Sequence, residues 1–252
     1  MNKSHLSYRT SNPALNSNTF KNPVKNSSLY LDKTMTIQGT VDKTAISLVL
    51  LIIAAYYTYS SGMESMIMIG SVGGLILAIV TIFKKQWAPF TVPFYAILEG
   101  LALGSLSYIY NLQYDGIVLQ AISITVLVLF SLLFAYRSKI IKPTENFKLG
   151  LFAATGGIFL LYLISFIMSF FGGGISIMNP QNSSLMSIGF SLFVVIIASL
   201  NLVLDFDFIE EASERNVPKY MEWYATFGLL VTLIWLYLEI LRLLAKLQSR
   251  RN

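Results

Sequence analysis

The residues of this chain that could do chemistry are acids and bases set within or beside long apolar stretches. They are Glu99, Asp205, Asp207, Glu239 and Arg242. An ionised side chain among lipid tails costs about 2.5–3.5 kcal/mol on insertion scales, so such groups face protein or a water-filled cavity. Clusters of carboxylates favour cations over anions. The five side chains are therefore predicted to line an ion pathway or its gate.

Among these side chains, Glu99 is the strongest single indication of a functional site. It lies midway along the apolar stretch 88–110, about 15 Å from either end of a helix. Two interpretations stay open. Glu99 is either a proton or cation group in a pathway, or a carboxyl kept protonated or satisfied by a hydroxyl on a neighbouring helix.

Asp205 opens an acidic run at the end of the apolar stretch 186–209. It lies near the C-terminal end of its predicted helix, where a negative charge is disfavoured. A cation, a proton or a basic side chain would relieve that charge. The acids that follow share one helix face by their spacing: Asp207, Glu210, Glu211 and Glu214. We interpret the last three as a solvated face, with Glu211 and Arg215 as an i,i+4 pair.

Glu239 and Arg242 have i,i+3 spacing in the last apolar stretch, so they can pair locally at the membrane edge. The alternative is that Arg242 pairs across helices with Glu99 and neutralises its charge. Glu222 begins the same stretch, next to Trp223 and its neighbouring tyrosine, which are typical interface anchors.

The composition indicates a membrane protein. Of 252 residues, 55% are hydrophobic and 12% are charged, and the mean hydropathy is +0.64. Because there is no cysteine, disulfides and thiolate metal sites are excluded. The single histidine, His5, lies in a polar segment, which argues against histidine metal sites and against a Ser-His-Asp triad. We expect no enzyme activity, no cofactor and no resident metal.

Seven apolar segments have spanning length: 45–61, 65–83, 88–110, 116–136, 150–171, 186–209 and 222–244. They predict an all-α, seven-transmembrane-helix bundle over 45–246. Residues 1–44 are predicted to be a flexible polar cytosolic tail, and residues 247–252 a short basic tail. Glycine pairs four residues apart, Gly70/Gly74 and Gly100/Gly104, predict closely packed helices.

Lys and Arg lie in the N-terminal tail and in the loops after the second, fourth and sixth segments, whereas the other three loops have none. This alternation predicts a cytosolic N-terminus in the inner (cell) membrane. It also explains the net charge of +5 without nucleic acid. Basic residues at the C-terminus disagree with a seventh crossing, so the last segment either crosses against its own charge or is re-entrant. We favour the crossing, because earlier helices usually fix orientation.

Three stretches carry a family resemblance: EGLALGSLSYIY at 99–110, LDFDFIEEA at 204–212 and LYLEILRLL at 236–244. Two pieces of the tail, TSNPAL at 10–15 and MTIQGTVDKT at 35–44, are typical of one bacterial subgroup of that family. Over about 35–246 the chain resembles the transmembrane Bax inhibitor motif family, in its bacterial YccA-like branch. The resemblance implies seven helices around a central one. It also implies a pH-sensitive leak of calcium or protons, gated near two buried aspartates.

Matched to that motif, Asp205 takes the position of the first aspartate, and Glu99 and Arg242 match the family's buried acid and base. The second aspartate position holds Thr232, which cannot share a proton as a carboxylate does. This departure puts the two-carboxylate gate in doubt. Asp207 and Glu222 are candidates to substitute, although neither position matches the motif.

Two functional hypotheses follow. In the first, the protein is an ion-leak channel in which Glu99, Asp205 and Glu239 line the route and Arg242 supplies the counter-charge. The alternative is a non-transporting regulator that binds a membrane protease or another stress-response protein, with the polar tail 1–34 folding on its partner. An intramembrane hydrolase is disfavoured, because no histidine lies in the apolar segments.

Overall fold

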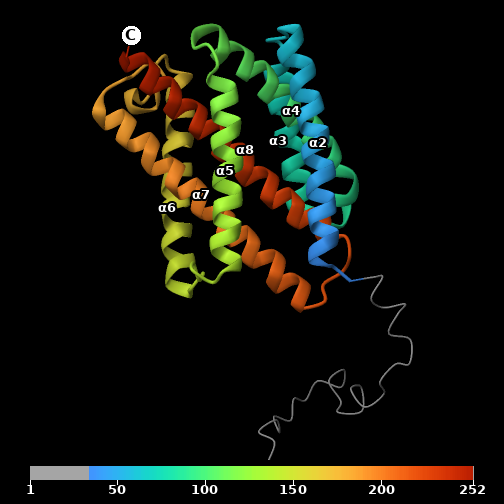
Figure 1. The fold of residues 1–252 in the computed structure, drawn as a ribbon. Helices are drawn as coiled ribbons and strands as arrows, with labels where there is room; N and C mark the ends of the chain where they lie inside the picture. Colours follow the sequence, from blue (N-terminus) through green and yellow to red (C-terminus); the bar gives the residue numbers. More distant parts are fainter. Residues whose placement is uncertain (1–33, 252) are drawn as a thin grey trace, which may run out of the picture. The chain divides into compact units, whose positions relative to one another are not determined.

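The computed structural model describes residues 34–251. In this part of the chain, seven helices are long and apolar enough to cross a membrane (Figure 1). They are α2 (Ile37–Ser61), α3 (Met66–Phe83), α4 (Ala88–Gln113), α5 (Ile117–Arg137), α6 (Glu145–Ser169), α7 (Leu185–Glu214) and α8 (Met221–Arg251). Two short 3₁₀ turns, η2 (Lys85–Trp87) and η3 (Ser176–Met178), lie in loops. The predicted seven-helix, all-α class is confirmed.

Local signals set several helix ends. Thr36 and Ser184 cap α2 and α7, because their side chains accept hydrogen bonds from the backbone N–H groups of Gly39 and Ser187. Gly62 ends α2 with a φ of 63°, a left-handed conformation that glycine adopts without strain. The short turn that follows leads into α3, and both helices pack against α4.

Two predicted boundaries were wrong. Helix α2 begins at Ile37, so the boundary at residue 44 falls inside a helix, and α8 runs to Arg251, so residues 247–251 are not a separate tail. The polar first turns of α2 are helical because α8 supplies partners: Thr226 hydrogen-bonds with Thr44 and donates to the backbone of Thr40. The rest of the predicted tail, including TSNPAL at 10–15, lies outside the described residues.

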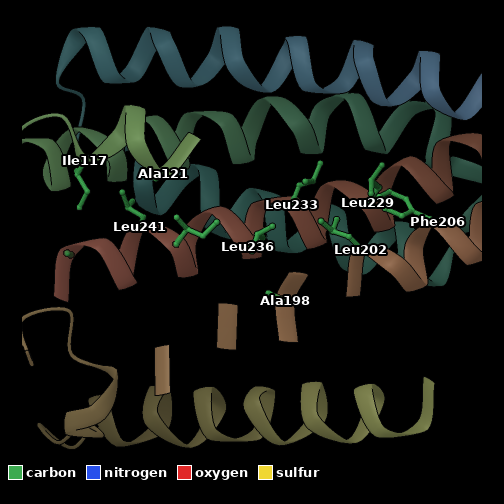
Figure 2. Packing of buried hydrophobic residues seen from close by; sticks show 11 residues of the cluster. Ile117, Ala121, Ala198, Leu202, Phe206, Leu229, Leu233, Leu236 and Leu241 are labelled. Carbon is green, nitrogen blue, oxygen red and sulfur yellow. The ribbon is translucent and has the colours of Figure 1, made fainter. Parts of the chain in front are cut away.

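Helix α8 is the central helix, as the family resemblance implies. It packs against α2, α4, α5 and α7, and more of its spanning segment is buried than in any of the other six helices. Figure 2 shows the apolar contact along its length, where Leu229, Leu233 and Leu236 of α8 lie among Leu202 and Phe206 of α7. Helix α6 packs mainly on α7 and leaves most of its apolar side chains exposed, as a lipid-facing helix would.

Helix α8 crosses the whole bundle. Its first turn contacts the start of α2 through Glu222 and Thr36, and its last turns contact the α4–α5 connection through a Ser249–Tyr114 hydrogen bond. Figure 1 shows the same diagonal course, with the C-terminus at the opposite end from the start of α2. The last segment is therefore one uninterrupted helix of spanning length, without the reversal that a re-entrant segment requires.

The glycine pairs bring α4 against both of its neighbours. A Cβ at Gly70 of α3 would meet the backbone of Leu98, and one at Gly100 or Gly104 of α4 would meet the backbone of α2. Backbone contact of this kind requires glycine. The prediction of close packing is confirmed, and it fixes Glu99 between α3 and the bundle interior.

Candidate functional site

A cavity of about 630 Å³ lies among α3, α4, α7 and α8, and both Glu99 and Asp205 line it. The other polar groups on its wall are Ser71, Tyr95 and Thr232. Apolar side chains complete the lining: Leu75, Ala78, Ile82, Phe227 and Val231. The structure thus brings two acids that are 106 positions apart in sequence to one partly polar space.

Asp205 is the acid of this cavity with a buried oxygen atom that lacks a hydrogen-bond partner in the described part of the chain. Its Oδ2 atom is buried and has no hydrogen-bond partner within the described residues. Thr232 lies beside the same carboxyl, but the Thr232 hydroxyl is 3.3 Å from the backbone oxygen of Gly228 and donates to it. Because a buried charge without a partner is strongly unfavourable, the Asp205 carboxyl requires a proton, a cation or ordered water.

Glu99 faces the same cavity from α4, about 17 Å from the start of that helix. It forms no ion pair within residues 34–251. Its carboxyl lies against Gly74 of α3, where an added Cβ would come within 2.5 Å of Glu99 Oε1. Gly74 therefore leaves the space that the carboxyl occupies.

Glu239 and Arg242 form a separate centre. Glu239 is 1% exposed, and Nη1 of Arg242 donates to both of its carboxylate oxygens at 2.9 and 3.0 Å. The hydroxyl of Tyr162, from α6, donates to the same carboxylate and accepts from Arg242 at 2.9 Å. The predicted local pair is confirmed. The alternative pairing of Arg242 with Glu99 is not formed; the ion pair of Arg242 within the described residues is with Glu239.

Asp207 also lies apart from the cavity. It forms an ion pair of 2.8 Å with Lys148, near the start of α6. Further along α7, Glu210 accepts a hydrogen bond from Tyr136, and Glu211 forms the predicted i,i+4 pair with Arg215. Asp207, Glu210 and Glu211 are therefore partnered, and Asp207 does not replace the missing second aspartate of the cavity.

Glu222 does not replace it either. Its side chain is fully buried at the start of α8, where it pairs with Lys43 and accepts 3.0 Å hydrogen bonds from the backbone N–H and hydroxyl of Thr36. Gly39 makes room for the carboxylate, because a Cβ there would overlap it. The sequence does not predict this Lys43–Glu222 ion pair, because the polar composition around Lys43 indicates a tail. Extending α2 by two turns would have exposed the pairing.

Lys246 is a second group that the sequence analysis did not single out. Its side chain is fully buried, and Nζ donates to the backbone oxygens of Ile177 and Ser187 and to Oγ of Ser191, at 2.7, 3.3 and 2.8 Å. Three donors and three acceptors leave the ammonium fully hydrogen-bonded. Lys246 thereby ties the last turns of α8 to the start of α7 and to η3.

Within residues 34–251, no group of three or more histidine, aspartate or glutamate side chains could hold a metal ion. The cavity thus offers two carboxyls, a phenol and two hydroxyls, together with whatever water enters. Such a set can hold a proton or a partly hydrated cation in passing. It lacks the dense oxygen cage with which proteins retain calcium permanently.

A comparison with protein families finds one match over nearly the whole chain. The model described as Bax inhibitor 1 like matches residues 12–249. Neither a curated protein sequence nor a solved structure matches the chain.

Proposed function

The chain belongs to the Bax inhibitor 1 like family, and from that premise we propose that it is an ion-leak protein of the inner membrane whose route passes through the Glu99–Asp205 cavity. Protons and calcium are the ions that the resemblance implies. Its seven apolar helices make it a multi-pass membrane protein, and an acidic cavity among them is suited to cations.

The observation that carries this proposal is the buried Oδ2 atom of Asp205, which has no hydrogen-bond partner within the described residues. The other acids discussed above at the bundle's interior and ends, Asp207, Glu210, Glu211, Glu222 and Glu239, have a partner. Asp205 instead has a buried oxygen without one, beside a cavity that also holds the unpaired Glu99. Ionisable groups left unpaired at hydrocarbon depth mark ion pathways and proton relays.

The mechanism differs from a gate made by two facing aspartates. Thr232 supplies only a hydroxyl, so the second carboxyl of the cavity is Glu99, which comes from α4 instead of α8. The titratable groups facing Asp205 across the cavity are Glu99 and Tyr95, both from α4; α3 and α8 contribute no charged lining. Protonation neutralises the two acids, and their ionisation makes the cavity attractive to cations. Flux is therefore expected to rise with pH for calcium.

The test is flux in vesicles. The purified full-length protein is reconstituted, and calcium and proton movements are recorded at several pH values for wild type, Asp205→Asn, Glu99→Gln and the control Asp207→Asn. We expect wild type and Asp207→Asn to conduct, and the two cavity variants to lose most of the flux. Wild-type flux no greater than that of empty vesicles refutes the proposal.

The same assay separates the channel from the regulator hypothesis. A variant lacking residues 1–33 should conduct as well as the full chain, because the cavity is formed by α3, α4, α7 and α8 alone. Loss of all flux on this deletion would contradict that. A regulator would instead show no flux in either form, and deletion of the tail would abolish binding to its membrane partner.

A further inference from the structure

A second cavity, of about 620 Å³, lies on the other side of α4 and α8 from the acidic one. Helices α2 and α5 form its walls, and α4 and α8 form its floor. The two walls do not pack closely on each other, although each packs on α8, which passes between them in Figure 1. The cavity is therefore a groove that faces the surrounding lipid.

The walls of this groove are apolar and long. On α5 the lining runs from Gly116 to Leu129, about 20 Å at 1.5 Å per residue. One leaflet contributes about half of the ~30 Å hydrocarbon core. The groove thus has the length to take one extended acyl chain from the headgroup level past the bilayer midplane.

One end of the groove is polar. Asn111 lies there, in the last turn of α4, and Asp115 follows in the connection to α5, with Tyr59 of α2 nearby. Deeper in, the hydroxyls of Ser107 and Tyr237 satisfy each other at 2.7 Å, so the floor presents no unpaired polar group from that pair. A largely apolar groove whose one charged side chain among the described residues, Asp115, lies at its mouth matches a molecule with one long tail and a polar head.

The walls favour a flexible tail over a partner helix. Where helices pack closely in this bundle, glycine allows backbone contact, as at Gly70 and Gly100. The groove walls instead carry large, exposed side chains, including Ile52, Tyr56 and Leu119. These keep a second helix at a distance, whereas an acyl chain can follow the irregular surface between them.

The charge at the mouth selects among head groups. Asp115 is exposed and forms no ion pair within the described residues. Its carboxylate accepts hydrogen bonds but donates none, so it suits a primary ammonium, which has three donors. A quaternary ammonium has the same charge and no donor. We propose that the groove between α2 and α5 binds a phospholipid with a primary-amine head group, its acyl chain between the walls and its ammonium on Asp115.

The experiment is native mass spectrometry of the full-length protein in detergent, with phosphatidylethanolamine or phosphatidylcholine of identical acyl chains. We expect a single adduct that favours the ethanolamine lipid by about 2- to 5-fold, the range for one exposed ion pair. Asp115→Asn should equalise the two lipids. Glu64→Gln, an acid in the loop at the same end of the bundle but outside the groove, should keep the preference.

A matched pair of variants tests the groove itself. Ile122 lines it and Ile124, two positions along α5, does not, although both are exposed. Ile122→Trp should abolish the adduct with either lipid, and Ile124→Trp should preserve it. Equal binding of both lipids by wild type, an adduct that survives Ile122→Trp, or a protein dimer in place of the adduct overturns the proposal. The Asp115 comparison decides the matter if Ile122→Trp does not fold.

Discussion

Helix α8 borders two polar regions that differ in whether their ionisable side chains have partners. Around Glu239 every ionised group has hydrogen-bond partners: Arg242 and Tyr162 satisfy the carboxylate, and Lys246, one turn beyond Arg242, has an acceptor for each of its donors. The second region lies at Thr232, about two turns before Glu239 along α8, where Asp205 of α7 and Glu99 of α4 share a cavity with no basic side chain among the described residues of its lining.

The difference separates charges that hold the fold from charges that are available to a ligand. Removing one member of a buried pair leaves the other uncompensated, which typically destabilises by about 3–5 kcal/mol. Removing a charge that has no partner leaves nothing behind and relieves its desolvation. The two regions should therefore respond to mutation with effects of different size on stability, and only the Asp205 region should respond strongly in flux.

The largest effect is expected from Arg242→Met. Glu239 is then left buried beside Tyr162 without its counter-charge, so we expect a loss of about 3–5 kcal/mol, measured by denaturant unfolding in detergent. Arg215→Met is the control, because its partner Glu211 is exposed and such pairs contribute about 1 kcal/mol or less. Adding Glu239→Gln to Arg242→Met should recover much of the loss. Unchanged stability of the single variant would show that the pair is not buried in the membrane.

Lys246→Met should have the next largest effect. It leaves the carbonyls of Ile177 and Ser187 and the hydroxyl of Ser191 without their donor, and an unsatisfied buried group costs about 1–3 kcal/mol. The neighbouring Arg250→Met, at an exposed position, serves as the reference. We expect faster proteolysis of the α6–α7 loop in Lys246→Met, since Lys246 anchors η3. Equal cleavage rates in the two variants would contradict this role.

Most of the difference between these two regions could not be predicted from the sequence, because the contacts that create it join residues far apart in the chain. Hydropathy is a local property, so it predicts the seven helices, and i,i+3 and i,i+4 spacing predicts the Glu239–Arg242 and Glu211–Arg215 pairs. The glycine spacing likewise predicts where backbones approach. Each of these patterns is formed by residues within one helix.

The partners that decide each charge's environment lie far away in sequence. Lys43 and Glu222 are 179 residues apart, and this contact makes the polar start of α2 helical when composition alone indicates a tail. Lys246 finds its acceptors 55 to 69 residues earlier. The pair of acids in the cavity is another long-range feature, because Glu99 and Asp205 come together only when four helices have packed.

The smallest effect on stability is expected from Asp205→Asn. A small effect would distinguish Asp205 from the paired charges around Glu239. No partner within residues 34–251 loses a bond to Oδ2, and a neutral amide removes the buried charge, so stability should stay within about 1 kcal/mol of wild type or rise. Unfolding in denaturant, measured beside the vesicle flux of the same preparation, gives both quantities. A variant that unfolds as easily as Arg242→Met would mean that the Asp205 carboxylate holds a structural partner, and the contrast between the two regions of α8 would disappear. We expect a variant that is as stable as wild type but conducts no ions, because the buried Oδ2 atom of Asp205 has no structural partner in the described part of the chain and is proposed to serve the ion.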